Sequence, residues 1–85
     1  MHIVRHPRFE KRITSLSPRI CVALADRLEL FIEDSRHPLL NNHALSGNRN
    51  GLRSINITGD WRLLYKVIDK EVILLVEIGT HHDLY

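Results

Sequence analysis

Four polar residues in the second half of the chain have side chains that can move protons or hold a phosphate: His43, Asp60, Arg62 and His81. An imidazole transfers protons near neutral pH, and a neighbouring carboxylate can orient it. A guanidinium held on a strand can bind a phosphate through two nitrogens. Together these residue types favour acid–base chemistry on a phosphodiester.

Each of these residues also has a plainer interpretation. Arg62 could form a cross-strand ion pair with Glu77, which contributes less than about 1 kcal/mol when exposed. A single surface histidine is often incidental, and the last residue, Tyr85, could either stack on a base or fray. The six histidines match no metal-ligand spacing, so the sequence predicts neither a metal nor another cofactor.

The first half of the chain predicts the elements that must position these residues. "HIVR" is typical of a short strand, and "HPRFEKRITSL" indicates a short basic helix with a proline in its first turn. The long helix begins after Ser17, a favourable capping residue, and ends before Pro38. Its core-facing stripe repeats at helical spacing and consists of Ile20, Leu24, Leu28 and Phe31.

The second half predicts an irregular loop over residues 39–51 and three strands, Leu52–Thr58, Trp61–Ile68 and Glu71–Thr80. A three-residue loop, Thr58 to Asp60, would pair Ile57 with Trp61 and align the apolar residues on one face. A two-residue turn at Asp69-Lys70 would pair Ile68 with Glu71, Arg62 with Glu77, and Trp61 with Ile78.

This register separates the sheet into two faces. One is apolar and covered by the two helices, with Ile55, Ile57, Trp61, Leu63, Tyr65, Val67, Val72, Leu74, Val76 and Ile78. The other is an open, partly polar surface and is the candidate site. Its polar residues are Ser54, Asn56, Arg62, Lys66, Glu77 and His81.

The composition describes one small α+β domain over residues 1–85. The hydrophobic content of 44% and charged content of 26% are those of an ordinary globular protein. No apolar run reaches the roughly 20 residues that a membrane span needs, and we expect no secretory signal. A lone cysteine fits a cytoplasmic location. Residues 1–19 hold five arginines or lysines and one acid. This basic segment could attract a polyanion or an acidic partner protein, or it could simply be a surface exposed to water.

Residues 43–85, "HALSGNRNGLRSINITGDWRLLYKVIDKEVILLVEIGTHHDLY", together with the "HPRFEKRITSL" opening and the long helix, resemble the bacterial RelE/ParE toxin superfamily. Within it, the pattern is most similar to the YafQ-like messenger-RNA interferases. The resemblance implies two N-terminal helices packed on one face of a small antiparallel sheet, in the order β-α-α-β-β-β. It also implies a type II toxin with a cognate antitoxin, and contact with operator DNA through that antitoxin.

The resemblance further implies metal-free cleavage of messenger RNA on the ribosome by attack of a 2′-hydroxyl on the adjacent phosphate. Matched by position, His81 would be the general acid and His43 or Asp60 the base. Arg62 would hold the phosphate, and Tyr85 would stack on a base.

Four further positions, Asn56, Trp61, Lys66 and Glu77, complete the expected substrate-binding set. Trp61 matches the family's Asp-Trp pair, but the predicted register turns it toward the core. Asn56 stands where the family pattern has a histidine, and Glu77 where it has an arginine. These departures keep two alternatives open: a ParE-like toxin that inhibits DNA gyrase by binding, and a catalytically silent homologue that binds an antitoxin.

Overall fold

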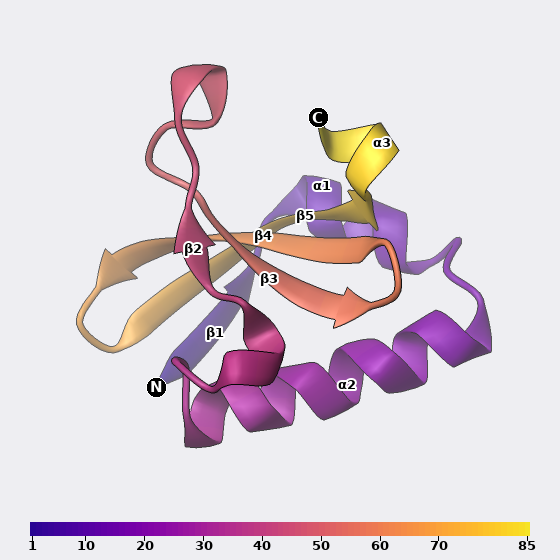
Figure 1. Ribbon diagram of the computed structural model, residues 1–85, viewed down its shortest axis with the longest axis horizontal. Helices are drawn as coiled ribbons and strands as arrows, with labels where there is room; N and C mark the ends of the chain where they lie inside the picture. The colour runs from indigo at the N-terminus through magenta and orange to yellow at the C-terminus, as the bar shows by residue number, and fades with distance from the viewer.

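The computed structural model describes every residue from Met1 to Tyr85. Its five strands form one sheet in the order β1-β5-β4-β3-β2 (Figure 1). β1 and β5 are parallel, and the other neighbouring pairs are antiparallel. The α+β fold class is confirmed. The strands are β1 (His2–Arg5), β2 (His43–Ala44), β3 (Arg53–Thr58), β4 (Trp61–Asp69) and β5 (Val72–Thr80).

The two predicted helices are α1 (Pro7–Ile13) and α2 (Pro18–Glu33). The Ser17 side chain caps α2 by accepting a hydrogen bond from the Ile20 amide at 3.4 Å, as the sequence predicts. Two short 3-10 helices, η1 (Pro38–Leu40) and η2 (Gly47–Arg49), shape the connection from α2 to β3. None of the helices is both long and apolar enough to cross a membrane.

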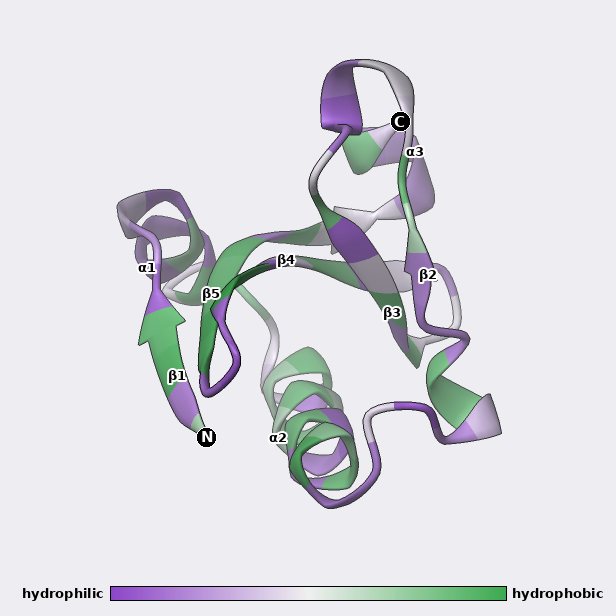
Figure 2. Ribbon diagram, turned by 90° about the vertical axis from the view of Figure 1, so that its left-hand side faces the viewer, coloured by the Kyte–Doolittle hydropathy of each residue, from purple (hydrophilic) through white to green (hydrophobic).

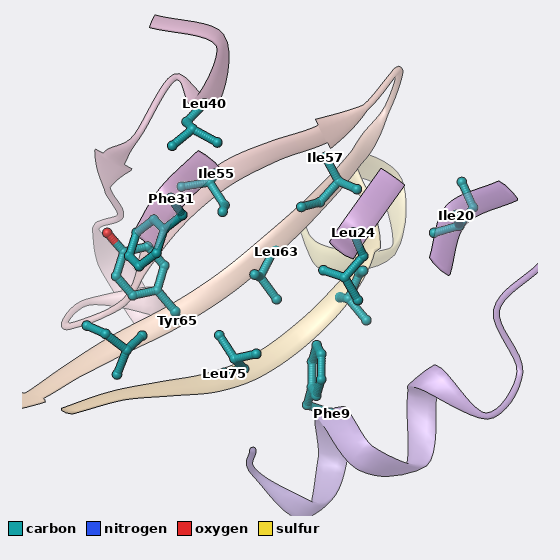
Figure 3. Packing of buried hydrophobic residues seen from close by; sticks show 12 residues of the cluster. Phe9, Ile20, Leu24, Phe31, Leu40, Ile55, Ile57, Leu63, Tyr65 and Leu75 are labelled. Carbon is teal, nitrogen blue, oxygen red and sulfur yellow. The ribbon is translucent and has the colours of Figure 1, made fainter. Parts of the chain in front are cut away.

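Both helices bury side chains against one face of the sheet, which we call the lower face, and together they form one core (Figure 3). The opposite side of the sheet is the upper face. Phe9 comes from α1, and Ile20, Leu24 and Phe31 come from α2. The Phe31 ring meets the Tyr65 ring edge-on at 5.0 Å. Figure 2 shows the same layering, with α2 below the hydrophobic strands and hydrophilic turns around them. The predicted packing of two N-terminal helices on one face is confirmed.

The turn between β3 and β4 differs from the prediction. Thr58 pairs with Trp61 across a two-residue Gly59-Asp60 turn, and Gly59 takes the positive φ of 50° that glycine tolerates. A β-bulge lies between Asn56 and Thr58. The extra residue, Ile57, changes the parity of the strand at this point, so the apolar set stays in the core with a short turn.

The register of β4 and β5 also differs. Asp69 pairs with Val72, and Arg62 lies opposite Gly79 instead of Glu77. Two irregularities, at Leu64/Tyr65 and at Val67/Asp69, shift the pairing. The core residues of β5 are therefore Ile73, Leu75 and Ile78, and Val72, Leu74 and Val76 are only half-buried. Val67 is exposed.

The upper face of the sheet is not fully open, contrary to expectation. A short helix, α3 (His81–Leu84), and the loop between β2 and β3 stand over it, opposite α2 (Figure 1). Ser54 and Leu64 on this face have no exposed surface, and Leu84 of α3 is buried above it. The pairing pattern alone could not indicate this cover, because both segments lie outside the predicted strands.

Candidate functional site

A row of paired residues crosses the upper face of the sheet. His43 pairs with Ser54, Ser54 with Leu64, and Leu64 with Glu77. Residues directly opposite each other in antiparallel strands share a face, so His43 and Glu77 lie on the same side of the sheet. The buried residues Ser54 and Leu64 lie in the middle of this row and separate His43 at one end from Glu77 at the other.

A second row lies two residues closer to the β3–β4 turn. Asn56 pairs with Arg62, and Arg62 with Gly79. Because strand side chains alternate, this row shares the upper face with the first. The structure therefore confirms that Asn56, Arg62 and Glu77 share a face, and it adds His43 through the short strand β2.

The His43 ring has a defined orientation. Its Nδ1 lies 2.8 Å from the backbone oxygen of Asn41. A carbonyl oxygen only accepts hydrogen bonds, so Nδ1 carries the proton. In the neutral ring, Nε2 is then the unprotonated nitrogen, and the residue is exposed. His43 is thus able to accept a proton from a bound molecule.

The residue before it, Asn42, fixes the loop that carries His43. The Asn42 amide nitrogen donates to the Ser35 backbone oxygen at 2.8 Å. The Tyr65 hydroxyl donates to Asn42 Oδ1 at 3.0 Å, and Arg53 Nε donates to the same oxygen at 2.9 Å. These bonds tie the segment that carries His43 to the turn after α2, to β3 and to β4, which limits the motion of His43.

Arg62 does not form the expected ion pair with Glu77. Its Nη1 donates to the backbone oxygens of Gly59 at 2.8 Å and Trp61 at 3.0 Å. No carboxylate is paired with this guanidinium, so its positive charge remains available at the turn. The position of the β4–β5 turn explains the difference: Asp69 pairs with Val72, and in the same register Glu77 lies opposite Leu64.

His81 begins α3 instead of ending a strand, and Tyr85 directly follows that helix. The centroids of the His81 and Tyr85 rings are 4.6 Å apart and the rings are tilted by 36°, so Tyr85 packs against the imidazole. The His81 amide donates to the backbone oxygen of Asp60 at 2.9 Å. This bond joins α3 to the turn that carries Asp60 and Arg62. The carboxylate of Asp60 is exposed and makes no hydrogen bond.

A capping box holds α3 in place. The Thr80 amide donates to Asp83 Oδ2 at 3.3 Å, and the Asp83 amide donates to the Thr80 hydroxyl at 3.2 Å. The bonds from Thr80, with Arg12 nearby, hold the pKa of the Asp83 carboxyl below its ordinary value. A sequence search for the capping pattern could have found this helix.

Glu77 is the centre of an ion-pair network that the sequence analysis missed. Arg8 of α1 lies 2.7 Å from one carboxylate oxygen, and Arg49 of η2 lies 2.8 Å from the other. The Glu77 side chain is only 16% exposed. Arg49 stands in a loop without periodicity, so no sequence pattern links it to Glu77.

Two other predicted site residues, Trp61 and Lys66, lie apart from His43, Arg62 and His81. Trp61 is half-buried against the core, and the Arg12 guanidinium lies 5.4 Å from the centre of its ring. Lys66 is exposed four residues along β4 from Arg62, a separation of about 13 Å along a strand. No group of three histidine, cysteine or acidic side chains is arranged to hold a metal ion.

Comparison with known proteins places the whole chain in one family. A family model described as "Bacterial toxin of type II toxin-antitoxin system, YafQ" matches residues 1–85. No curated protein sequence matches the chain.

Several solved structures share the fold. YafQ from E. coli strain BL21(DE3) has a TM-score of 0.81 and 22% identity, covering 98% of this chain and 96% of that one. YafQ in the E. coli DinJ–YafQ toxin–antitoxin complex has a TM-score of 0.78 and 23% identity, with coverages of 98% and 94%. A YoeB/ParE toxin from Agrobacterium tumefaciens has a TM-score of 0.77 and 18% identity, with coverages of 95% and 99%.

Proposed function

Because the chain belongs to the YafQ family of bacterial toxins of type II toxin–antitoxin systems, we propose that it is an endoribonuclease that cleaves messenger RNA on the ribosome. The observation that carries the proposal is the orientation of His43. Its Nδ1 proton is engaged by Asn41, which leaves Nε2 free to accept a proton on the face that also holds Arg62.

The reaction we propose is a transesterification without a metal. His43 removes the proton from a ribose 2′-hydroxyl, and the oxygen attacks the adjacent phosphorus. The bond from phosphorus to the 5′-oxygen breaks as His81 donates a proton to that oxygen. The products are a 2′,3′-cyclic phosphate and a 5′-hydroxyl, so atoms and charge balance. Asp60 is the second candidate for the base.

Arg62 is the residue that we expect to stabilise the charge on the phosphorane. Its guanidinium is bonded only to backbone oxygens, so its charge is not neutralised by a carboxylate. A positioned cation of this kind is worth the most where negative charge develops in the transition state. We place Asn56, the cross-strand neighbour of Arg62, beside it in substrate binding.

The remaining expected residues have supporting roles. Tyr85 is half exposed beside His81 and can stack on a base. Lys66, farther along the face, can contact a more distant phosphate. Trp61 packs against the core and supports the turn that carries Asp60. Glu77 acts through the arginines that it holds.

We also propose that the protein is neutralised by a cognate antitoxin and contacts operator DNA only through it. The family description and the E. coli DinJ–YafQ complex support the antitoxin partner. The basic α1 offers a surface for an acidic partner, since its last turn carries Lys11 and Arg12.

The test is the chemistry of the products. Purified toxin is added to ribosomes programmed with a short messenger RNA, and the fragments are weighed by mass spectrometry. We expect a 2′,3′-cyclic phosphate on the upstream fragment, only when ribosomes are present, and none with His81→Ala. An intact messenger RNA together with inhibited DNA supercoiling by gyrase would overturn the proposal in favour of a gyrase-binding toxin.

A further inference from the structure

Arg27 stands on the face of α2 that packs against the sheet. It lies three residues after Leu24 and four before Phe31, both of which are buried in the core. Residues at these separations share one side of a helix, so an apolar side chain would be expected at this position. Arg27 is half-buried there and forms no ion pair with a carboxylate. A partly buried guanidinium therefore needs another partner.

The partner of Arg27 is a backbone oxygen of the neighbouring strand. Its Nε donates to the Ile57 carbonyl oxygen at 3.0 Å. α2 runs beneath β3 (Figure 1), and the Ile57 side chain is buried in the same core as Leu24 (Figure 3). A hydrogen bond from a charged donor is stronger than one between two neutral groups. The bond thus ties the middle of α2 to one carbonyl of β3.

Ile57 is the extra residue of the β-bulge near the end of β3. Asn56 pairs with Arg62 and Thr58 pairs with Trp61, and Ile57 has no partner in β4. Bulges are common next to functional sites, where they redirect a side chain and interrupt the regular pairing. Arg27 therefore supplies a hydrogen bond at the point where the ladder of β3 and β4 is irregular.

The turn that follows the bulge connects three candidate residues of the site. Asp60 lies in this turn and Arg62 follows it, with Arg62 Nη1 donating to the Gly59 backbone oxygen at 2.8 Å. The backbone oxygen of Asp60 accepts a hydrogen bond from the His81 amide at 2.9 Å. Because Ile57 is only two residues before Gly59, a displaced bulge would displace the turn as well. A misplacement of about 1 Å can lower a reaction rate about 10²-fold, even when its origin is far from the chemistry.

We propose that Arg27 is a positioning residue for the cleavage reaction. By holding the Ile57 carbonyl, it fixes the bulge and therefore the direction in which the turn presents Arg62. Arg27 lies on the lower side of the sheet, with α2, and acts on the upper face only through the backbone of β3. The inference rests on the proposed function for the reaction itself.

Three variants of the full-length protein test the role of this side chain. Arg27→Met removes the donor and keeps an unbranched side chain that suits both a helix and the core. Arg27→Lys keeps the positive charge and N–H donors. Arg19→Met is the matched control, because Arg19 is exposed on the same helix and forms no ion pair.

Amide hydrogen exchange reports the state of the turn without any RNA. In Arg27→Met we expect the protection of the His81 amide, which donates to Asp60, to fall about tenfold or more. The Leu45 amide, which donates to the Leu52 oxygen in the β2–β3 loop, should keep its wild-type protection. Arg27→Lys should lose less protection at the turn, and Arg19→Met none. An equal loss at both amides, or no loss at either, would overturn the inference.

Single-turnover cleavage on ribosomes reports the consequence for the reaction. We expect Arg27→Met to lower the maximal rate about tenfold or more at an unchanged half-saturating toxin concentration. The reason is that the surface that meets the RNA is intact and only the placement of the turn changes. Arg27→Lys should recover part of the rate, and Arg19→Met should cleave like the wild type.

The two measurements separate the role of Arg27 from the proposed nuclease activity. If the wild type cleaves RNA and Arg27→Met cleaves it equally fast, the nuclease proposal stands and the role of Arg27 is contradicted. If the wild type cleaves no RNA, the nuclease proposal fails, and the exchange pattern alone decides whether Arg27 fixes the turn.

Discussion

Arg49 and Glu77 are 28 residues apart in the sequence and form a 2.8 Å charge-assisted hydrogen bond that joins the β2–β3 loop to strand β5. The same guanidinium donates a hydrogen bond to the Leu84 backbone oxygen at the end of α3. The ion pair between Glu77 and Arg49 thus fixes the two segments that cover the upper face, the β2–β3 loop and α3.

Replacing the anion with a third cation should disrupt this arrangement. In Glu77→Arg, Arg8 and Arg49 would lose their shared partner and face a new like charge. We expect the free energy of unfolding to fall by about 2 kcal/mol or more. Urea denaturation measures it, with Glu71→Arg as control. Glu71 is 74% exposed and pairs only with the N-terminus, so its change should stay below about 1 kcal/mol. Equal losses in the two variants would contradict the network.

Tyr65 should stabilise the loop that carries His43 through its hydroxyl group. Tyr65→Phe keeps the ring against Phe31 and removes the bonds to Asn42. We expect a loss of about 1–2 kcal/mol in unfolding free energy, because Asn42 stays half-buried with fewer partners. Tyr85→Phe is the matched control and should leave stability unchanged, since the Tyr85 hydroxyl makes no hydrogen bond. A fully stable Tyr65→Phe protein would show that the hydroxyl does not anchor the loop.

The attachment of α3 should depend on pH through Asp83. The Thr80 hydrogen bonds lower the pKa of this carboxyl below its ordinary 3.8. A group whose pKa is lowered by folding stabilises the fold above its unfolded pKa, and the effect is lost as the pH falls through the folded value. We therefore expect the α3 amides to lose protection, measured as the exchange rate relative to the intrinsic rate at the same pH, below about pH 4. Asp83→Asn should remove this pH dependence, and an unchanged acid response in that variant would exclude Asp83 as its source.

Arg62 should contribute to cleavage and little to folding. Its side chain bonds only to two turn carbonyls, so Arg62→Ala should fold normally and slow single-turnover cleavage about 10²-fold or more. Arg62→Lys should recover part of the rate, because it restores the charge but not the fork. Lys70→Ala, in the exposed β4–β5 turn, is the control. Full activity of Arg62→Ala would contradict the assigned role.

The sequence was informative where local chemistry decides the structure. The Ser17 cap, the apolar stripe of α2 and the order of the three long strands follow from short-range patterns. The predicted loop gives the observed pairing of Asn56 with Arg62 and of Ile55 with Leu63, but the bulges could not be predicted, and each of them adds one residue and reverses the parity. Ile57 shows this most clearly: the alternation of its strand favours a three-residue loop, and the structure solves the same conflict with a bulge.

The candidate site was only partly predictable for the same reason. Asn56 and Arg62 share a face, as the predicted pairing implies, because the bulge begins only after Asn56. The partners of Glu77 come from α1 and η2, which lie far away in the sequence, and no pairing rule connects them. The contact between the Tyr85 and His81 rings depends on α3, a helix of a single turn that a strand pattern extending to Thr80 does not reveal.

The most direct test of the central claim uses a messenger RNA whose scissile 5′-oxygen is replaced by sulfur. A thiolate leaves without a proton, so general-acid catalysis is no longer needed. We predict that His81→Gln cleaves the normal RNA far more slowly than the wild type on ribosomes, and that the sulfur substrate restores its rate. His43→Gln should stay slow on both substrates, because the 2′-hydroxyl still needs a base. Equal impairment of His81→Gln on both RNAs would contradict the assignment of His81 as the acid, and full activity of both variants would contradict the account as a whole.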